Sequence, residues 1–507
     1  MYGRLLRGGV HRELPCWNHL QRRAMFVRYG RWRTRLQRIG DLLWGGMHSH
    51  RHGRELWGMR THLRGLGRML RRHVSQHQRR SHELRPLRQR VRLQCRWLLG
   101  RLMHLWWGAC VFSYPLLRRQ LLDLKMPSAR LRAHYTAFLR EGRILLTGHS
   151  HQAWPDVARA AQLEAFDDAA LHVDEKWGPA LEAAEDVRRA VATRIQCTPA
   201  EVALASNTHE LITRFLSALD WKKRPRIVST RGEFHSIYRQ LSRLAEEGME
   251  VVWVDPLPAD SLAQRLSATV DAKTAGVLVS NVLFETSSCV PGLAQLAKRC
   301  ALEGAQLLVD SYHAFNVVPF AVSDLGGELF VVGGGYKYAQ WGEGCCFLRV
   351  PSAFEGRPIY TGWFSDFDGL SAPRDGRPVQ YGPRPAERFA GSTYDPTSHY
   401  RARRVARFFD EQGLDVDTLR RISLTQTSQL VEGLAGFDVR TPKSDEARGG
   451  FVSVHLENAS EVSTALAARG IHTDVRGSLL RLGPAPYTTA SEIEVALQAL
   501  RSVSRND

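Results

Sequence analysis

The chain has 507 residues, eight cysteines and a formal net charge of +19. Its length exceeds that of small disulfide-stapled proteins, and no cysteine spacing matches a CxxC metal or redox motif, which argues against both classes. The charge is uneven, because residues 1–125 hold 27 arginines and one lysine against five acidic residues, a net of +23, whereas the remaining 382 residues carry a net of −4.

Residues 1–125 are interpreted as a segment that is not part of the natural protein. Arginine-rich composition with almost no lysine is typical of GC-rich DNA translated ahead of a start codon, and ordinary composition begins at Met126. One alternative is nucleic-acid binding through phosphate neutralisation. Another is an organelle-targeting peptide, but such peptides are several times shorter than this segment. The third is a membrane segment over 98–112, but Arg101 and His104 interrupt that run, and it is too short to span a membrane. We expect no membrane association, no nucleic-acid partner and a cytoplasmic location.

From about residue 140, short apolar runs alternate with amphipathic helical segments. The predicted strands, in chain order, are 226–230, 250–254, 274–282, 305–310 and 328–334. Apolar residues at spacings of three and four predict helices over 236–248 and 291–304 between them. This alternation predicts an α/β fold with a mostly parallel sheet that is covered by helices on both faces.

A second region begins near residue 400, where two helical segments are followed by a strand, a helix, a strand and a helix. We therefore predict a large domain over 126–395 and a smaller C-terminal α/β domain over 396–507. Residues 352–395, rich in glycine, proline and aromatic residues, are expected to form an ordered loop.

Polar and aromatic residues follow the predicted strands, and ligands of open parallel sheets bind at the carboxyl ends of the strands. An Asn-Thr pair precedes a helical segment whose N-terminus can bind an anion. An aspartate ends 305–310 and a histidine lies three residues further on, and a lysine lies three residues after 328–334. The candidates are Asn207, Thr208, Phe234, Ser236, Ser280, Asp310, His313 and Lys337.

Pyridoxal phosphate requires four kinds of group in its binding site, and the candidates supply all of them: an amine, a carboxylate, an aromatic face and an anion site. The amine bonds to the aldehyde, the carboxylate keeps the ring nitrogen protonated, and the helix N-terminus binds the phosphate. The glycines before Lys337 are expected to let the backbone approach this cofactor without side-chain clash. No metal site is expected.

The segments VDSYHAFNVVPF (309–320) and GGGYKY (333–338) resemble those of class V, fold-type I pyridoxal-phosphate enzymes, and among them kynureninase. The resemblance covers about residues 140–500. It implies the fold-type I architecture, with Lys337 as the Schiff-base lysine, Asp310 as the partner of the pyridine nitrogen and His313 close to the ring. It also implies phosphate contacts from Asn207, Thr208, Ser280 and Tyr336, and ring stacking by Phe234.

The same resemblance implies a substrate site for an amino acid. Trp363, in TGWF, corresponds to a substrate-site loop, and Arg481, in LRLGPAPYTT, to the arginine that binds the substrate α-carboxylate. His172 falls near a substrate-contacting histidine. RFAGST also resembles a segment whose threonine, here Thr393, reaches the phosphate of a neighbouring subunit, which implies a homodimer.

Two positions differ from the kynureninase pattern, so the resemblance does not identify the substrate. Ile237 stands where kynureninases carry aspartate, and Thr393 stands near the position of their asparagine. The first hypothesis is a kynureninase-like enzyme that hydrolyses a Cβ–Cγ bond and releases alanine, and the second is a class V aminotransferase. A cysteine desulfurase is disfavoured because no cysteine follows Cys346. The third is a nucleic-acid-binding protein that uses the basic N-terminus.

Overall fold

The computed structural model describes residues 128–504. The interpretations of residues 1–125, including the nucleic-acid hypothesis, lie outside this range. The first helix in the range is α5 (Ser128–Arg132), and no helix within 128–504 is both long and apolar enough to cross a membrane.

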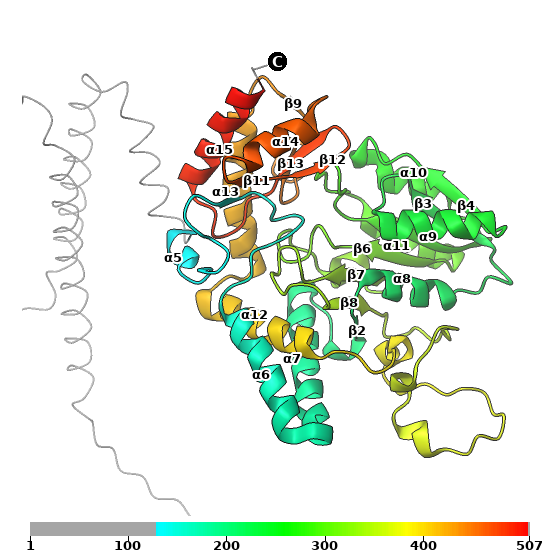
Figure 1. Cartoon of the computed structure of the whole chain (residues 1–507). Helices are drawn as coiled ribbons and strands as arrows, with labels where there is room; N and C mark the ends of the chain where they lie inside the picture. The colour runs from blue at the N-terminus through cyan, green and yellow to red at the C-terminus, as the bar shows by residue number, and fades with distance from the viewer. Residues whose placement is uncertain (1–127, 505–507) are drawn as a thin grey trace, which may run out of the picture. The chain divides into compact units, whose positions relative to one another are not determined.

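A seven-stranded sheet forms the centre of the large domain (Figure 1). Six strands run in one direction, and only β8 is antiparallel to its two neighbours, so the prediction of a mostly parallel sheet is confirmed. In spatial order the strands are β2 (Val202–Ala205), β8 (Cys346–Arg349), β7 (Phe330–Gly334), β6 (Gln306–Asp310), β5 (Thr274–Ser280), β3 (Arg226–Thr230) and β4 (Glu250–Val254).

Two apolar cores cover the two faces of this sheet. Successive residues of a strand point to opposite faces; accordingly, Val277 and Val279 of β5 belong to one core and Leu278 to the other. Helices α10 (Leu262–Thr269) and α11 (Leu293–Glu303) contribute to the first core, and α8 (Thr208–Ser217) and α9 (His235–Glu246) to the second.

Three long helices pack together beside the sheet: α6 (Val157–His172), α7 (Trp177–Ile195) and α12 (Thr397–Gln412). Between β8 and α12 the chain runs through a long irregular segment with three short 3-10 helices, η5 (Trp363–Ser365), η6 (Asp368–Ser371) and η7 (Pro385–Phe389). Helix α12 lies in the predicted small domain by sequence, yet it packs on helices of the large one.

The C-terminal unit has its own sheet, in the order β12 (Asp474–Arg476), β13 (Leu479–Leu482), β10 (Val452–His455) and β9 (Asp438–Val439). Helices α13 (Val416–Gly433), α14 (Ala459–Ala467) and α15 (Ala490–Val503) share its core. Strand β1 (Ile144–Leu145) pairs in parallel with β11 (Ile471–His472), and Leu146 lies in the same core. Residues near the start of the described chain therefore complete the C-terminal unit, which the expected boundary at 395/396 did not anticipate.

Candidate active site

The ends of three adjacent parallel strands bring Ser280, Asp310 and Lys337 to one edge of the sheet. Ser280 and Asp310 are the last residues of β5 and β6 and are paired in register. Asp310 is also paired with Val332 of β7, and Lys337 lies three residues beyond the end of that strand. The common strand direction therefore places the predicted amine and carboxylate side by side.

Lys337 and His313 form a close buried pair. The Lys337 Nζ lies 2.6 Å from the Nε2 of His313, and both side chains are buried. Burial lowers the pKa of the Lys337 amine to about 7, although the charge of Asp310 opposes the shift. Burial also lowers the pKa of His313 well below its usual value, and the charge of Lys337 adds to this effect. Desolvation thus favours the neutral imidazole and raises the share of unprotonated amine at neutral pH.

Asp310 is a buried carboxylate that uses only part of its hydrogen-bonding capacity. Its Oδ1 accepts the backbone N–H of Tyr312 at 2.8 Å, and its Oδ2 has no hydrogen-bond partner among residues 128–504. Burial raises the pKa of this carboxyl, while the Lys337 charge works in the opposite direction. A buried aspartate with one oxygen left free of hydrogen bonds from the described residues fits a protonated pyridine nitrogen, so the donor set suits the expected cofactor.

Three aromatic rings enclose the Lys337 amine. The ring centroids of Tyr312, Phe234 and Tyr336 lie 4.8, 5.5 and 5.8 Å from Nζ. Phe234 precedes α9 and supplies the aromatic face expected from the sequence. Tyr312 was not predicted, although its position between Asp310 and His313 in the sequence could have indicated it.

The glycines before Lys337 pack closely against aromatic side chains of the chain itself. A Cβ at Gly333 would clash with the Phe347 ring, and one at Gly334 would clash with the hydroxyl of Tyr312. A Cβ at Gly335 would clash with Trp341 in the same way. These glycines are therefore required by the packing of the chain's own aromatic residues.

Two helix N-termini lie at the same ends of strands. Asn207 is the N-cap of α8, and its Oδ1 accepts the N–H of Glu210 at 2.9 Å, so its side chain caps its own helix. Thr208 begins that helix. Helix α9 begins after Phe234 without a side-chain cap, and Ser236 lies half-buried in its first turn. First-turn N–H groups of both helices can serve an anion.

Glu233 is a buried acid that the sequence analysis missed. Its Oε2 accepts the hydroxyl of Ser280 at 2.6 Å, and its Oε1 accepts the hydroxyl of Thr230 at 2.7 Å. Burial raises the pKa of this carboxyl to about 7, and the charge of Asp310 contributes a smaller part. Glu233 therefore links the ends of β3 and β5 and fixes the hydroxyl of Ser280.

The raised pKa of Glu233 predicts a pH-dependent stability. A carboxyl whose pKa rises on folding contributes stability that is lost as pH rises towards the folded pKa, so the wild-type free energy of unfolding should fall between about pH 4.5 and 7. Glu233→Gln keeps hydrogen-bonding capacity without titrating, and it should become the more stable protein by roughly 3 kcal/mol at pH 8. Urea unfolding of both proteins at several pH values measures the difference.

Glu432→Gln, an exposed position on α13, is the control and should leave the pH profile unchanged. Parallel profiles for Glu233→Gln and the wild type would show that Glu233 does not titrate in this range.

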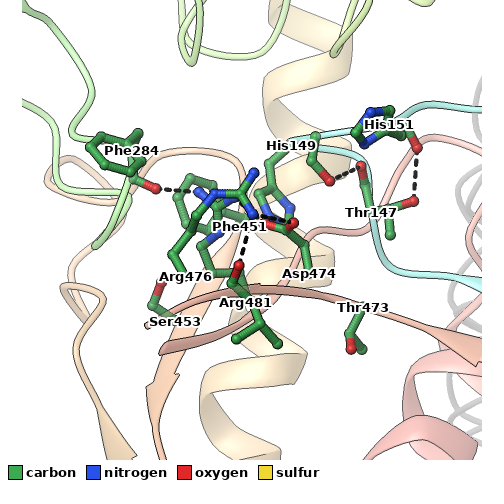
Figure 2. A network of polar contacts seen from close by, with 12 residues as sticks. Thr147, His149, His151, Phe284, Phe451, Ser453, Thr473, Asp474, Arg476 and Arg481 are labelled. Carbon is green, nitrogen blue, oxygen red and sulfur yellow. Dashed lines mark hydrogen bonds and ion pairs between the residues drawn. The ribbon is translucent and has the colours of Figure 1, made fainter. Parts of the chain in front are cut away.

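Arg481 lies in a polar network between the two domains (Figure 2). Its Nε and Nη2 donate to Oδ2 of Asp474, and its Nη1 donates to the carbonyl of Phe284, in the loop after β5. His149, which the sequence analysis did not single out, is buried, stacks on Phe451 at 4.4 Å and lies 3.4 Å from Asp474. Burial lowers the pKa of His149 to about 3, so its imidazole is neutral.

Three predicted residues are not brought to Lys337. His172 ends α6 and is exposed, Trp363 is 45% exposed, and Thr393 is exposed. Thr393 lines an open cavity of about 1310 Å³, which Lys337 and Asp310 do not line. His172 and Trp363 do not line that cavity either.

Comparison with known proteins agrees with this geometry. Residues 419–500 match the family model described as the kynureninase C-terminal domain. A kynureninase from Burkholderia pseudomallei (strain 1106a) is 30% identical over 425 residues, which cover 75% of this chain and 94% of that protein. The chain belongs to the kynureninase family. A kynureninase from Geobacillus thermodenitrificans is 24% identical over 356 residues, covering 64% of this chain and 79% of that protein.

Solved structures share the fold. A C-DES variant with glycine covalently linked to its PLP cofactor matches with a TM-score of 0.64 at 18% identity, over 73% of this chain and 98% of that chain. A cysteine desulfurase from Thermococcus onnurineus matches with a TM-score of 0.62 at 19% identity, over 75% of this chain and 98% of that chain. The predictions of the fold-type I architecture and of a kynureninase-like, pyridoxal-phosphate-dependent enzyme are confirmed.

Proposed function

We propose that the protein hydrolyses the Cβ–Cγ bond of an amino acid with a γ-carbonyl group and releases L-alanine. The observation that carries the proposal is the buried pair of Lys337 and His313 beside the carboxylate of Asp310, in a chain of the kynureninase family. The substrate is a small molecule, and L-kynurenine is its first candidate.

The residues that would hold pyridoxal phosphate surround Lys337. Lys337 would carry it, Asp310 would bind its ring nitrogen, and Phe234 would cover its ring. Phosphate and remaining ring contacts are assigned to Asn207, Thr208, Ser236, Ser280, His313, Tyr336 and Thr393. When bound, the cofactor supplies an electron sink for bond cleavage next to the substrate Cα.

The chain's own residues supply the proton transfers and the polarity of the site. The lowered pKa of Lys337 provides a neutral amine near pH 7, which can accept a proton from the substrate Cα. His313, 2.6 Å from this amine, holds it in place and can exchange a proton with it. The carboxylate of Asp310, at the end of β6, would stabilise a protonated ring nitrogen. The surrounding aromatic rings exclude water and strengthen these interactions.

A homodimer is part of this proposal. His172, Trp363 and Thr393 lie away from Lys337, and large exposed apolar side chains, among them Phe166 and Ile359, are present in the same helical and loop segments. Exposed apolar surface of this kind is typical of protein contacts. We assign it to a second copy of the chain, which would bring its Thr393 segment to the site. A cytoplasmic location is also proposed.

A class V aminotransferase remains the second candidate, because one position departs from the kynureninase pattern. Ile237 is completely buried in the core beneath α9, so no carboxylate lies at the position where kynureninases carry aspartate. Both reactions begin with removal of a proton from Cα, and Lys337 can serve either.

Product analysis with a panel of amino acids separates the two functions. The purified protein, loaded with pyridoxal phosphate, is incubated with L-kynurenine, other γ-keto amino acids and common amino acids, with and without a keto acid. The hydrolase proposal predicts L-alanine from the γ-keto substrates without any keto acid present. Keto-acid formation from the amino acid, only when an acceptor keto acid is added, would establish the aminotransferase instead.

A further inference from the structure

One face of the C-terminal sheet carries a set of charged residues towards the Lys337 site. Asp474 and Arg481 are directly opposite each other in the antiparallel pair β12–β13. Arg476 lies two residues after Asp474, so strand alternation puts it on the same face. Ser453 of β10, opposite Arg481, donates its hydroxyl to the carbonyl of Glu285 in the loop after β5. This face is therefore the one that contacts the large domain.

Most of the donor capacity of Arg481 is already used on this face. Asp474 accepts from its Nε and Nη2, the carbonyl of Phe284 accepts from Nη1, and the ring of Phe451 lies 5.4 Å from its guanidinium carbon. Arg481 is only 2% exposed. A guanidinium has five N–H donors, so Arg481 is fixed in position with few of them left for a ligand.

Arg476 is more exposed than Arg481 and uses fewer of its hydrogen-bond donors. Its side chain is 35% exposed, and only its Nη1 is bonded, to Oδ1 of Asp474 at 2.9 Å and to the carbonyl of Val475 at 2.7 Å. Its Nε and Nη2 have no partner within the described part of the chain. Burial is the main cause of the lowered pKa values of Lys337 and His313, and the charge of Arg476 adds to both shifts. Burial raises the pKa of Tyr336, and the charge of Arg476 opposes that rise. Arg476 is thus a guanidinium with free donors beside the site.

We propose that Arg476 is a second ligand of the substrate α-carboxylate, in addition to Arg481; the inference rests on the proposed function. Asp474 binds one arginine with each of its two oxygens and so holds both guanidinium groups on one face (Figure 2). Its single negative charge offsets one of the two positive charges. The remaining unit charge matches one carboxylate, and charge-assisted hydrogen bonds from a guanidinium suit such a group.

The test compares L-alanine, the product of the proposed reaction, with L-alaninamide, which has the amine but no carboxylate. Calorimetric titration uses the full chain saturated with pyridoxal phosphate. Arg476→Gln should raise the dissociation constant of L-alanine by about ten- to a hundredfold and leave that of L-alaninamide unchanged. Arg476→Lys should recover only part of the affinity, because lysine lacks the planar fork. Arg469→Gln, an exposed position in the same unit, should have no effect.

Each other outcome contradicts the inference in a distinct way. Unchanged L-alanine affinity in Arg476→Gln, with weakened affinity in Arg481→Lys, would show that Arg481 binds the carboxylate alone. Equal losses for L-alanine and L-alaninamide would show that Arg476 only supports the structure. A parent protein that binds no pyridoxal phosphate would overturn the proposed function and this inference together, whereas the first two outcomes overturn the inference alone.

Discussion

Lys337→Ala is expected to lower the rate of L-alanine release by at least about a thousandfold and to remove the borohydride-trappable cofactor adduct. In the proposed mechanism the buried amine, with its pKa lowered to about 7, is both the point of covalent attachment and the proton acceptor at Cα. Loss of a positioned proton acceptor alone typically costs a hundred- to ten-thousandfold. Turnover assays and mass spectrometry of the borohydride-reduced protein measure the two effects separately.

Lys298→Ala is the matched control, because Lys298 is an exposed lysine on α11 of the same domain. It should retain both the adduct and the activity. If the Lys337→Ala protein still yields the reduced adduct at wild-type stoichiometry, another amine carries the cofactor and the assignment of Lys337 is wrong.

Asp310→Asn is expected to reduce turnover by about a hundred- to a thousandfold while the fold survives. Asparagine keeps the shape of the side chain and can still accept the N–H of Tyr312, so the change isolates the charge. Without that charge a protonated pyridine nitrogen is no longer stabilised, and removal of one preorganised electrostatic partner typically costs this much. The Asp310 charge also raises the pKa of Lys337, so the variant should bind the cofactor at a lower pH than the wild type does.

The control for this change is Asp324→Asn, at an exposed aspartate in the 3-10 helix Val322–Leu325. Circular dichroism and thermal melting establish that each variant is folded. Near-normal turnover in a folded Asp310→Asn protein would mean that Asp310 only caps the turn that leads to His313.

The sequence was sufficient to predict the sheet and the part of the site that depends on it. Each predicted parallel strand is present within about two residues of its expected bounds, because continuous apolar runs and intervening amphipathic helices both reflect burial on two faces. The positions of the strand ends were then enough to predict that Ser280, Asp310 and Lys337 lie close together, since parallel strands end at the same edge.

The parts that could not be predicted depend on contacts between distant segments. Leu146 and Ile471 share the core of the C-terminal unit although they lie far apart in the sequence, and no local pattern of apolar residues indicates that pairing. Arg476 and His149 reach the site by the same long-range packing. The packing around the glycines could not be predicted for a related reason, because the side chains that fill the space beside Gly334 could not be identified from its neighbours.

The burial of Glu233 could not be predicted from the sequence for a different reason. It lies next to Phe234, a residue that was predicted, but a glutamate at the start of a helix is usually solvated, and nothing local indicates that this one is buried. Its burial follows from the hydroxyls of Thr230 and Ser280, which satisfy both of its oxygens across two strands.

The visible absorbance spectrum of the purified protein, before and after borohydride reduction, tests the central claim most directly. With pyridoxal phosphate added, the protein should show a visible band that free cofactor at the same concentration does not show, and reduction should abolish that band. Peptide mapping of the reduced protein should then find the cofactor on the peptide that contains Lys337. Absence of the band at saturating cofactor, or a reduced adduct on a different lysine, would contradict the account.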